Sequence, residues 1–131
     1  MSLFNKFFGN SDSKDTTSSS SFKWNDLTDI KQLDDVVAES ANQAVILFKH
    51  STRCPVSRMA LKNFENEYAI DADAAKPYFL DLIEHRDISN EIAARFNVVH
   101  QSPQVLVIKE GKSVYDESHD SIDAGVVKGK V

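Results

Sequence analysis

A single cysteine, Cys54, stands in the string TRCPVS at residues 52–57. Proline is favoured at the first position of a helix, because its missing N–H would have no partner there and its fixed φ suits the helix. Pro55 therefore predicts a helix that begins at this proline and has Cys54 as its N-cap residue. Free backbone N–H groups and the positive end of the helix dipole favour a thiolate at such a position, and the thiolate is the form that attacks disulfides.

The neighbours of Cys54 strengthen this interpretation. Thr52 and Arg53 precede the cysteine, and the guanidinium of Arg53 places a cation beside the sulfur. Arg58 can add a second cation from the next turn, and the hydroxyl of Ser57 can donate to the thiolate. A lone cysteine is often a small buried core residue instead. A core position would gain nothing from an arginine and a proline on either side of the sulfur, so we predict a reactive cysteine.

A second signal lies in the string HQSPQ at residues 100–104, directly before an apolar run at residues 105–108. A proline before a strand is often only a turn residue. It can also follow a cis peptide bond, which would leave the backbone of Ser102 free to pair with an extended substrate segment. We expect a cis bond between Ser102 and Pro103, placed beside Cys54 by the order of the strands.

Helical and strand patterns alternate along the chain around these two motifs. The run AVILF at residues 44–48 is unbroken and rich in β-formers, which is typical of a central strand covered on both faces, and Lys49 and His50 should end it. Asn97 can take the left-handed conformation that stops the third helix. We expect helices with Thr28, Cys54 and Ser89 as N-caps, a short last helix that begins near Asp120 or Ser121, and strands at residues 44–48, 78–83, 105–108 and 113–118. A turn between the last two strands makes them an antiparallel hairpin, and the whole order predicts an α/β fold with parallel strands joined by crossover helices.

The length and composition indicate one folded domain. The chain has 131 residues, of which 41% are hydrophobic, enough for a single core. Small polar residues dominate residues 10–21, so we expect a flexible segment at residues 1–21 and a domain at residues 22–131. Apolar side chains near the start predict either a short segment that docks weakly on a membrane surface or a partner, or one that is frayed or folds back on the domain. These apolar side chains are Leu3, Phe4, Phe7 and Phe8.

The charge and the cysteine count exclude several classes of partner. The net charge is −5 and the pI is near 5.3, which argues against nucleic acid and against attachment to anionic lipid through charge. One cysteine allows no intrachain disulfide, and no signal peptide or long apolar run is visible, so we expect a cytoplasmic protein without stable membrane insertion. The four histidines show no zinc-type spacing, and we expect no metal site. His100, beside the proline motif, either lines the site or lies on the surface.

The two strings together resemble the thioredoxin superfamily, in which Cys-x-x-Ser at the head of a helix is followed later by Ser-Pro before a hairpin. TRCPVS and HQSPQ in particular resemble the bacillithiol-system monothiol bacilliredoxins, the YtxJ-like family. The similarity covers residues 22–127 in order and without large gaps. It implies an α/β, thioredoxin-like fold in which a central mixed sheet has a C-terminal antiparallel hairpin and helices on both faces.

The resemblance also implies an activity, which is removal of bacillithiol from S-bacillithiolated client proteins. Cys54 matches the redox cysteine of the family, Ser57 the position of the resolving cysteine in dithiol relatives, and Pro103 the cis proline. Because the chain has no second cysteine, bacillithiol or another thiol must act as the reductant that regenerates Cys54.

Bacillithiol would enter as a co-substrate, and no cofactor is implied. Its malate carboxylates could be held by Arg53, Lys49 or Arg58. Lys49 and Arg58 are equally well interpreted as ordinary solvated cations.

Three other functions fit parts of the sequence. A peroxiredoxin would have a hydroxyl residue where Ser51 stands, but it would have proline where this chain has Leu47. A monothiol glutaredoxin that carries an iron-sulfur cluster would resemble Cys-Gly-Phe-Ser, from which Pro55 and Val56 depart. A thioredoxin-fold binding module, or a carrier of an iron-sulfur cluster or of bacillithiol without exchange activity, remains open, because a fold alone does not imply a reaction.

Overall fold

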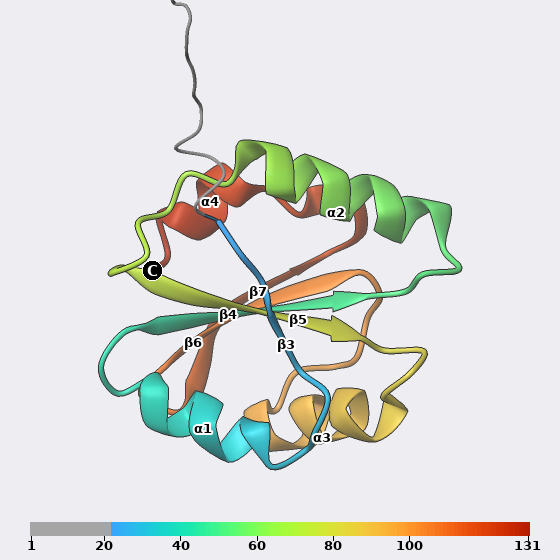
Figure 1. The fold of residues 1–131 in the computed structure, drawn as a ribbon. Helices are drawn as coiled ribbons and strands as arrows, with labels where there is room; N and C mark the ends of the chain where they lie inside the picture. The colour runs from blue at the N-terminus through green and yellow to red at the C-terminus, as the bar shows by residue number, and fades with distance from the viewer. Residues whose placement is uncertain (1–21) are drawn as a thin grey trace, which may run out of the picture.

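The computed structural model describes residues 22–131, and the predictions for residues 1–21 lie outside the described residues. The described chain forms a five-stranded sheet with helices on both faces (Figure 1). The elements in chain order are β3 (Asn25–Asp26), α1 (Gln32–Glu39), β4 (Ala44–His50), α2 (Pro55–Glu67), β5 (Ala75–Asp81), α3 (Arg86–Phe96), β6 (Gln104–Lys109), β7 (Lys112–Ser118), the 3-10 turn η3 (His119–Ser121) and α4 (Ala124–Lys128). The α/β class, the mixed sheet and the C-terminal hairpin are confirmed.

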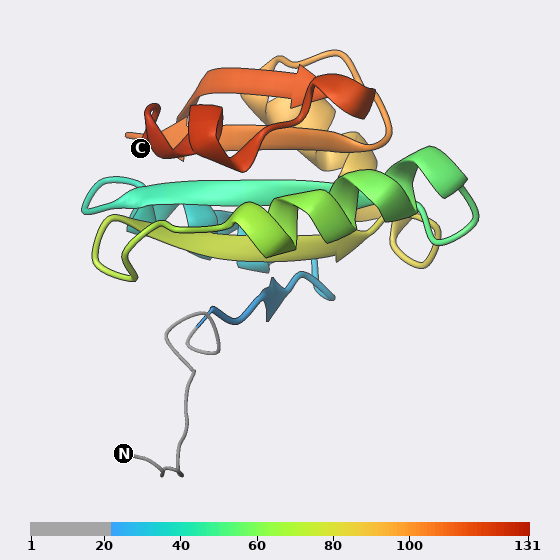
Figure 2. The same ribbon diagram turned by 90° about the horizontal axis from the view of Figure 1, so that it is seen from above.

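The central strand of the sheet is β4. The strands lie in the order β3-β5-β4-β6-β7, which Figure 2 shows from the side of α2. β4 is parallel to β5 and antiparallel to β6, and β7 forms the edge antiparallel to β6. Because α2 is the crossover between the parallel strands β4 and β5, its first turn lies at the C-terminal end of β4.

The apolar run of β4 divides between two cores because side chains alternate across a sheet. Val45 and Leu47 pack with α1 and α3 on one face, whereas Ile46 and Phe48 pack with α2 and α4 on the other. All four side chains are fully buried. At roughly 1.5–3 kcal/mol for each such side chain, their burial holds the end of β4 firmly between the two helical layers.

Two helices begin at residues other than those predicted. α1 begins at Gln32, whose side-chain Oε1 accepts hydrogen bonds from the backbone N of Thr28 at 2.7 Å and of the following residue at 3.0 Å. Thr28 is therefore not the N-cap: Lys31 directly precedes the helix, and the side chain that accepts from this turn is that of Asp29, whose Oδ1 accepts from Lys31 N at 2.9 Å. α3 begins at Arg86, which places Ser89 inside the helix and buries it. Asn97 does end α3, with φ at 56° as predicted.

The strand boundaries also differ from the predicted ones. β4 continues to His50, so Lys49 and His50 belong to the strand and are buried in it. β5 begins at Ala75 and ends at Asp81, earlier than predicted at both ends. Its start was missed because a proline, here Pro77, argues against a central strand.

The last helix begins later than predicted, and the short strand β3 has no counterpart among the predicted strands. β3 has two residues and pairs in parallel with β5 at the edge of the sheet. Asp120 and Ser121 belong to η3, and α4 begins only at Ala124. Asp123 caps this helix, because its carboxylate accepts from two N–H groups of the first turn. None of the helices among residues 22–131 has the length and apolar character needed to cross a membrane.

Candidate functional site

Cys54 lies between the end of β4 and the first turn of α2. Its backbone is extended, with φ at −105° and ψ at 119°, and Pro55 occupies the start of the helix, so the N-cap placement is confirmed. The cysteine is half-buried. Within residues 22–131 no first-turn N–H donates to the sulfur, so the expected contact with these groups is absent. A reactive thiolate at Cys54 therefore stays a prediction.

The hydroxyl of Ser57 has partners other than the sulfur. Ser57 is fully buried in the first turn of α2, and its Oγ accepts a hydrogen bond from Ser51 N at 2.9 Å. The same Oγ lies 2.8 Å from His50 Nδ1. A hydroxyl both donates and accepts, so the tautomer of His50 sets which of these two groups donates. Among residues 22–131 the partners of the Ser57 hydroxyl are His50 and the backbone of Ser51, and the predicted donation to Cys54 is not present.

His50 is a buried neutral base next to the cysteine helix. Its side chain is 5% exposed, and its ring centroid lies 5.5 Å from that of Phe79. Burial is the largest influence and lowers the pKa of His50, while the carboxylates of Asp81 and Glu65 act in the opposite direction. His50 is therefore neutral near pH 7, and its Nδ1 shares a hydrogen bond with Ser57 Oγ.

The two arginines near the sulfur lie at the surface. Nη1 of Arg58 donates to the carbonyl oxygen of Thr52 at 3.2 Å and so braces the loop that precedes the cysteine. Arg53 is exposed and adjoins Cys54 in the chain. Carboxylate binding by either arginine stays a prediction.

The predicted cis peptide bond between Ser102 and Pro103 is present. Pro103 is buried directly before β6, and the register pairs the next residue, Gln104, with Lys49 near the end of β4. The carbonyl oxygen of Pro103 accepts a hydrogen bond from His119 N at 3.0 Å. The hydroxyl of Ser102 is buried and has no hydrogen-bond partner within residues 22–131. The segment directly before β6 and the start of α2 directly after β4 thus lie at the same end of these two paired strands (Figure 2).

Lys49 differs most from the sequence prediction. It is fully buried, and alternation along β4 places its side chain on the face covered by α1 and α3. Its Nζ lies 2.8 Å from His100 Nδ1 and 3.2 Å from Gln104 Oε1. Burial lowers the pKa of Lys49 to about 8. Lys49 is therefore neither a solvated cation nor a surface ligand for a carboxylate.

The sequence analysis did not predict that polar residues at the end of β4 form two hydrogen-bonded clusters. One joins His50 to the first turn of α2, and the other joins Lys49 to His100 and Gln104. The available signal was a pair of polar residues directly after an apolar strand. In the described part of the chain, no group of three or more His, Cys, Asp or Glu residues is placed to hold a metal ion.

The family model described as Monothiol bacilliredoxin BrxC matches residues 25–127. The chain belongs to the monothiol bacilliredoxin family. The bacilliredoxin match includes both the TRCPVS and the HQSPQ strings and extends from β3 into α4. The resemblance inferred from these two strings is confirmed.

Solved structures of similar shape show the fold of the chain. One, described as a candidate oxidoreductase with a thioredoxin fold, is 29% identical with a TM-score of 0.71, and the match covers 87% of this chain and 97% of that chain. Thioredoxin from Malassezia sympodialis is 17% identical with a TM-score of 0.64, covering 82% of this chain and 87% of that one. Thioredoxin from Fasciola hepatica is 16% identical with a TM-score of 0.60, covering 80% and 93%. The predicted thioredoxin-like fold is confirmed.

Proposed function

We propose that this chain removes bacillithiol from S-bacillithiolated client proteins and that Cys54 carries the bacillithiol away as a mixed disulfide. Membership in the bacilliredoxin family and the thioredoxin fold support a redox role as a thiol-disulfide oxidoreductase. The observation that carries the proposal is the position of the single cysteine as N-cap of α2, at the end of the paired strands β4 and β6 where Pro103 also lies.

The proposed reaction is two successive thiol-disulfide exchanges. In the first, the Cys54 thiolate attacks the bacillithiol sulfur of the client disulfide. A bond forms between Cys54 Sγ and that sulfur, the bond to the client sulfur breaks, and the client thiolate takes up a proton from water. In the second, the thiolate of bacillithiol or of another thiol attacks the bound bacillithiol and releases the Cys54 thiolate. Each exchange replaces one disulfide by another, so electrons balance with these thiols alone.

The surrounding residues suit the partners that this reaction requires. Arg53 would hold the carboxylates of bacillithiol, and the loop that contains Thr52 would flank it. The backbone of Ser102, next to Pro103, would pair with an extended segment of the client. A thiol must arrive from outside to complete the cycle, and the reducing cytoplasm is the compartment that supplies one.

Intact mass spectrometry tests the proposal directly. After incubation with a bacillithiolated client protein, we expect one bacillithiol on Cys54 and one bacillithiol fewer on the client. The same client modified with glutathione is the matched substrate, on which transfer should be slower. Equal rates on the two clients would leave a general disulfide exchanger. Absence of an adduct from either client would end the exchange proposal in favour of a binding module or carrier.

A further inference from the structure

Lys49 is a buried cation without an acidic partner among the described residues. It is fully buried in the central strand, and none of the ion pairs within residues 22–131 includes it. Taking an ammonium group out of water is costly unless an opposite charge and hydrogen bonds compensate for the lost hydration. A methionine of similar volume would fill the same place at lower cost. Packing alone therefore does not account for a lysine at this position.

The hydrogen bonds of Lys49 lead to the segment between α3 and β6. Its ammonium donates to His100 Nδ1 at 2.8 Å and to Gln104 Oε1 at 3.2 Å. The side-chain nitrogen of Gln104 donates in turn to the carbonyl oxygen of Val99 at 3.0 Å. From α3, Ser89 Oγ lies 3.4 Å from the same nitrogen of His100. The central strand thus holds the segment directly at His100 and through Gln104 at Val99.

This segment, residues 97–103, ends in Ser102 and Pro103, the residues that the proposed function places against the client. We propose that Lys49 is a positioning residue, which holds residues 97–103 through these hydrogen bonds so that Ser102 stays where a client chain can pair with it. The inference rests on the proposed function, because it concerns the same site.

The position of Lys49 separates its role from that of the sulfur. Its side chain lies on the face of α1 and α3, whereas the neighbouring His50 points to the face of α2 and bonds with its first turn. Cys54 begins that helix. Loss of the Lys49 hydrogen bonds should therefore affect recognition of a client and leave the intrinsic reactivity of Cys54 unchanged.

We call the hydrogen bonds from Lys49 to His100 and Gln104 the tether. It requires a neutral His100, because only then can Nδ1 accept from an ammonium. The groups that face His100 are Lys49 from β4 and Ser89 and Arg86 from α3, while Gln104 from β6 faces Lys49. Burial, Lys49 and Arg86 all lower the pKa of His100, so it is neutral at pH 7. When the pH falls through this lowered pKa, a second cation stands against Lys49 and the tether is lost.

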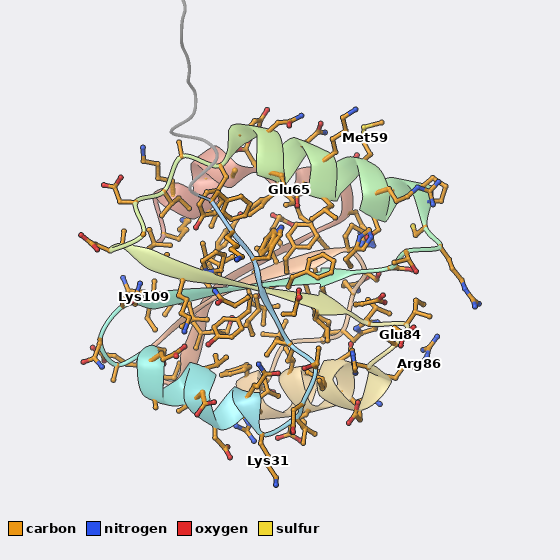
Figure 3. The ribbon with its side chains drawn as sticks, viewed as in Figure 1. Lys31, Met59, Glu65, Glu84, Arg86 and Lys109 are labelled. Carbon is orange, nitrogen blue, oxygen red and sulfur yellow. The ribbon has the colours of Figure 1, made fainter. Side chains whose placement is uncertain are left out.

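Lys49→Met tests the tether, since it removes the charge and keeps the volume. We expect amide hydrogen exchange at residues 98–102 to become about tenfold faster and bacillithiol transfer from a client to fall about fivefold. Alkylation of Cys54 by iodoacetamide should stay within about twofold, and the Tm should not fall. Lys109→Met is the matched control, because Lys109 is exposed at the far end of the sheet (Figure 3) and should change none of these values.

His100 supplies a readout that a purely structural role would not move. His100→Gln keeps an acceptor that does not titrate, so its transfer should match the wild type at pH 7. The ratio of its rate to the wild-type rate should rise as the pH falls to about 5. His100→Leu removes the acceptor and should reproduce the slower transfer of Lys49→Met at pH 7.

Three results would overturn the inference. The first is unchanged hydrogen exchange at residues 98–102 in Lys49→Met, and the second is unchanged transfer despite faster exchange. The third is a loss of transfer that follows an equal loss of Cys54 alkylation and of Tm. If the wild type itself gives no adduct on Cys54, the proposed function fails, and hydrogen exchange still decides whether Lys49 holds the segment. Should Lys49→Met not fold, His100→Leu serves for the same measurements.

Discussion

Lys49 and His50 are neighbours in β4, yet they act on opposite faces of the sheet and on different halves of the site. His50 bonds to Ser57, seven residues along the chain, and so acts within the unit formed by β4 and α2. Lys49 bonds to His100, 51 residues away, and so joins the central strand to the segment before β6. The end of one strand therefore supports the cysteine helix by a local contact and the proline segment by a distant one.

The two contacts also differ in charge. His50 is neutral near pH 7, and its hydrogen bond with Ser57 joins two neutral groups. Lys49 carries a positive charge into the protein interior, where burial lowers its pKa to about 8. Loss of the His50 hydrogen bond should therefore lower the free energy of unfolding, whereas loss of the Lys49 charge should not. Removing a partner of His50 leaves a buried polar group unsatisfied. Lys49→Met leaves Gln104 Oε1 without its donor but also relieves the larger cost of a buried charge.

The largest effect is expected from Cys54→Ser, which removes the atom on which both halves of the site act. A hydroxyl is not a nucleophile toward sulfur at neutral pH, so bacillithiol transfer should fall to the background rate. Cys54→Ala should behave in the same way. The measurement is intact mass of both proteins after mixing, with Tm as the control for folding. Transfer above background by a folded variant would place the chemistry on another residue.

The next effect concerns the stability of Lys49→Met at high pH. Burial lowers the pKa of Lys49 from 10.5 to about 8, so between these pH values the unfolded chain binds a proton that the folded chain does not. The contribution of Lys49 to wild-type stability therefore rises with pH across this window. At about 1.4 kcal/mol for each pH unit, the advantage of Lys49→Met should shrink by up to about 3 kcal/mol. Urea unfolding of both proteins across this range measures it, and a constant difference would contradict a buried charge.

Ser57→Ala should act on the other face of the sheet. It leaves the buried N–H of Ser51 and the imidazole of His50 without their partner, so the free energy of unfolding should fall by about 1–3 kcal/mol. Transfer should slow but continue, because Cys54 still begins α2. Urea unfolding gives the first value and the client assay the second. Ser121→Ala, at an exposed serine, is the control, and equal stability of the two variants would mean that the His50 contact contributes nothing.

The smallest effect is the pH dependence due to His50. Burial lowers its pKa below 6.5, so the stability that comes from a neutral His50 is complete above pH 6.5 and is lost as the pH falls toward the folded-state value. His50→Gln should flatten this part of the curve of Tm against pH. Because the pKa of His100 is lowered as well, the same scan on His100→Gln separates the two histidines. An unchanged slope in His50→Gln would contradict a buried neutral imidazole.

Sequence alone predicted the features whose causes are local. Pro55 fixes the start of α2 through its own ring, and Asn97 ends α3 because it tolerates φ at 56°. Sequence alone did not predict the features that depend on residues far away in the chain. A polar pair after an apolar run looks like the end of a strand. Pairing with β5 carries β4 through His50, and pairing with β6 reaches Lys49. Ser89 likewise resembles a helix cap until the fold buries it inside α3.

The residue types of the site were thus easier to predict than their partners. Ser57 was expected near the sulfur from its spacing alone, and it does lie in the first turn of α2. The direction of its hydroxyl depends on His50, whose place in the buried strand was not foreseen. Spacing along a helix gives proximity, but the choice among competing partners is set by the surrounding fold.

The buried oxygen of Ser57 has a kinetic consequence. An oxygen cannot displace bacillithiol from Cys54, so under the proposed function the adduct has no internal route of decay. Formation of the adduct would follow the load of modified clients, and its disappearance would follow the supply of small thiols outside the protein. The steady-state fraction of modified chain would then report the ratio of bacillithiolated clients to free small thiols. A chain with a second cysteine that reduces its own adduct could not report this ratio.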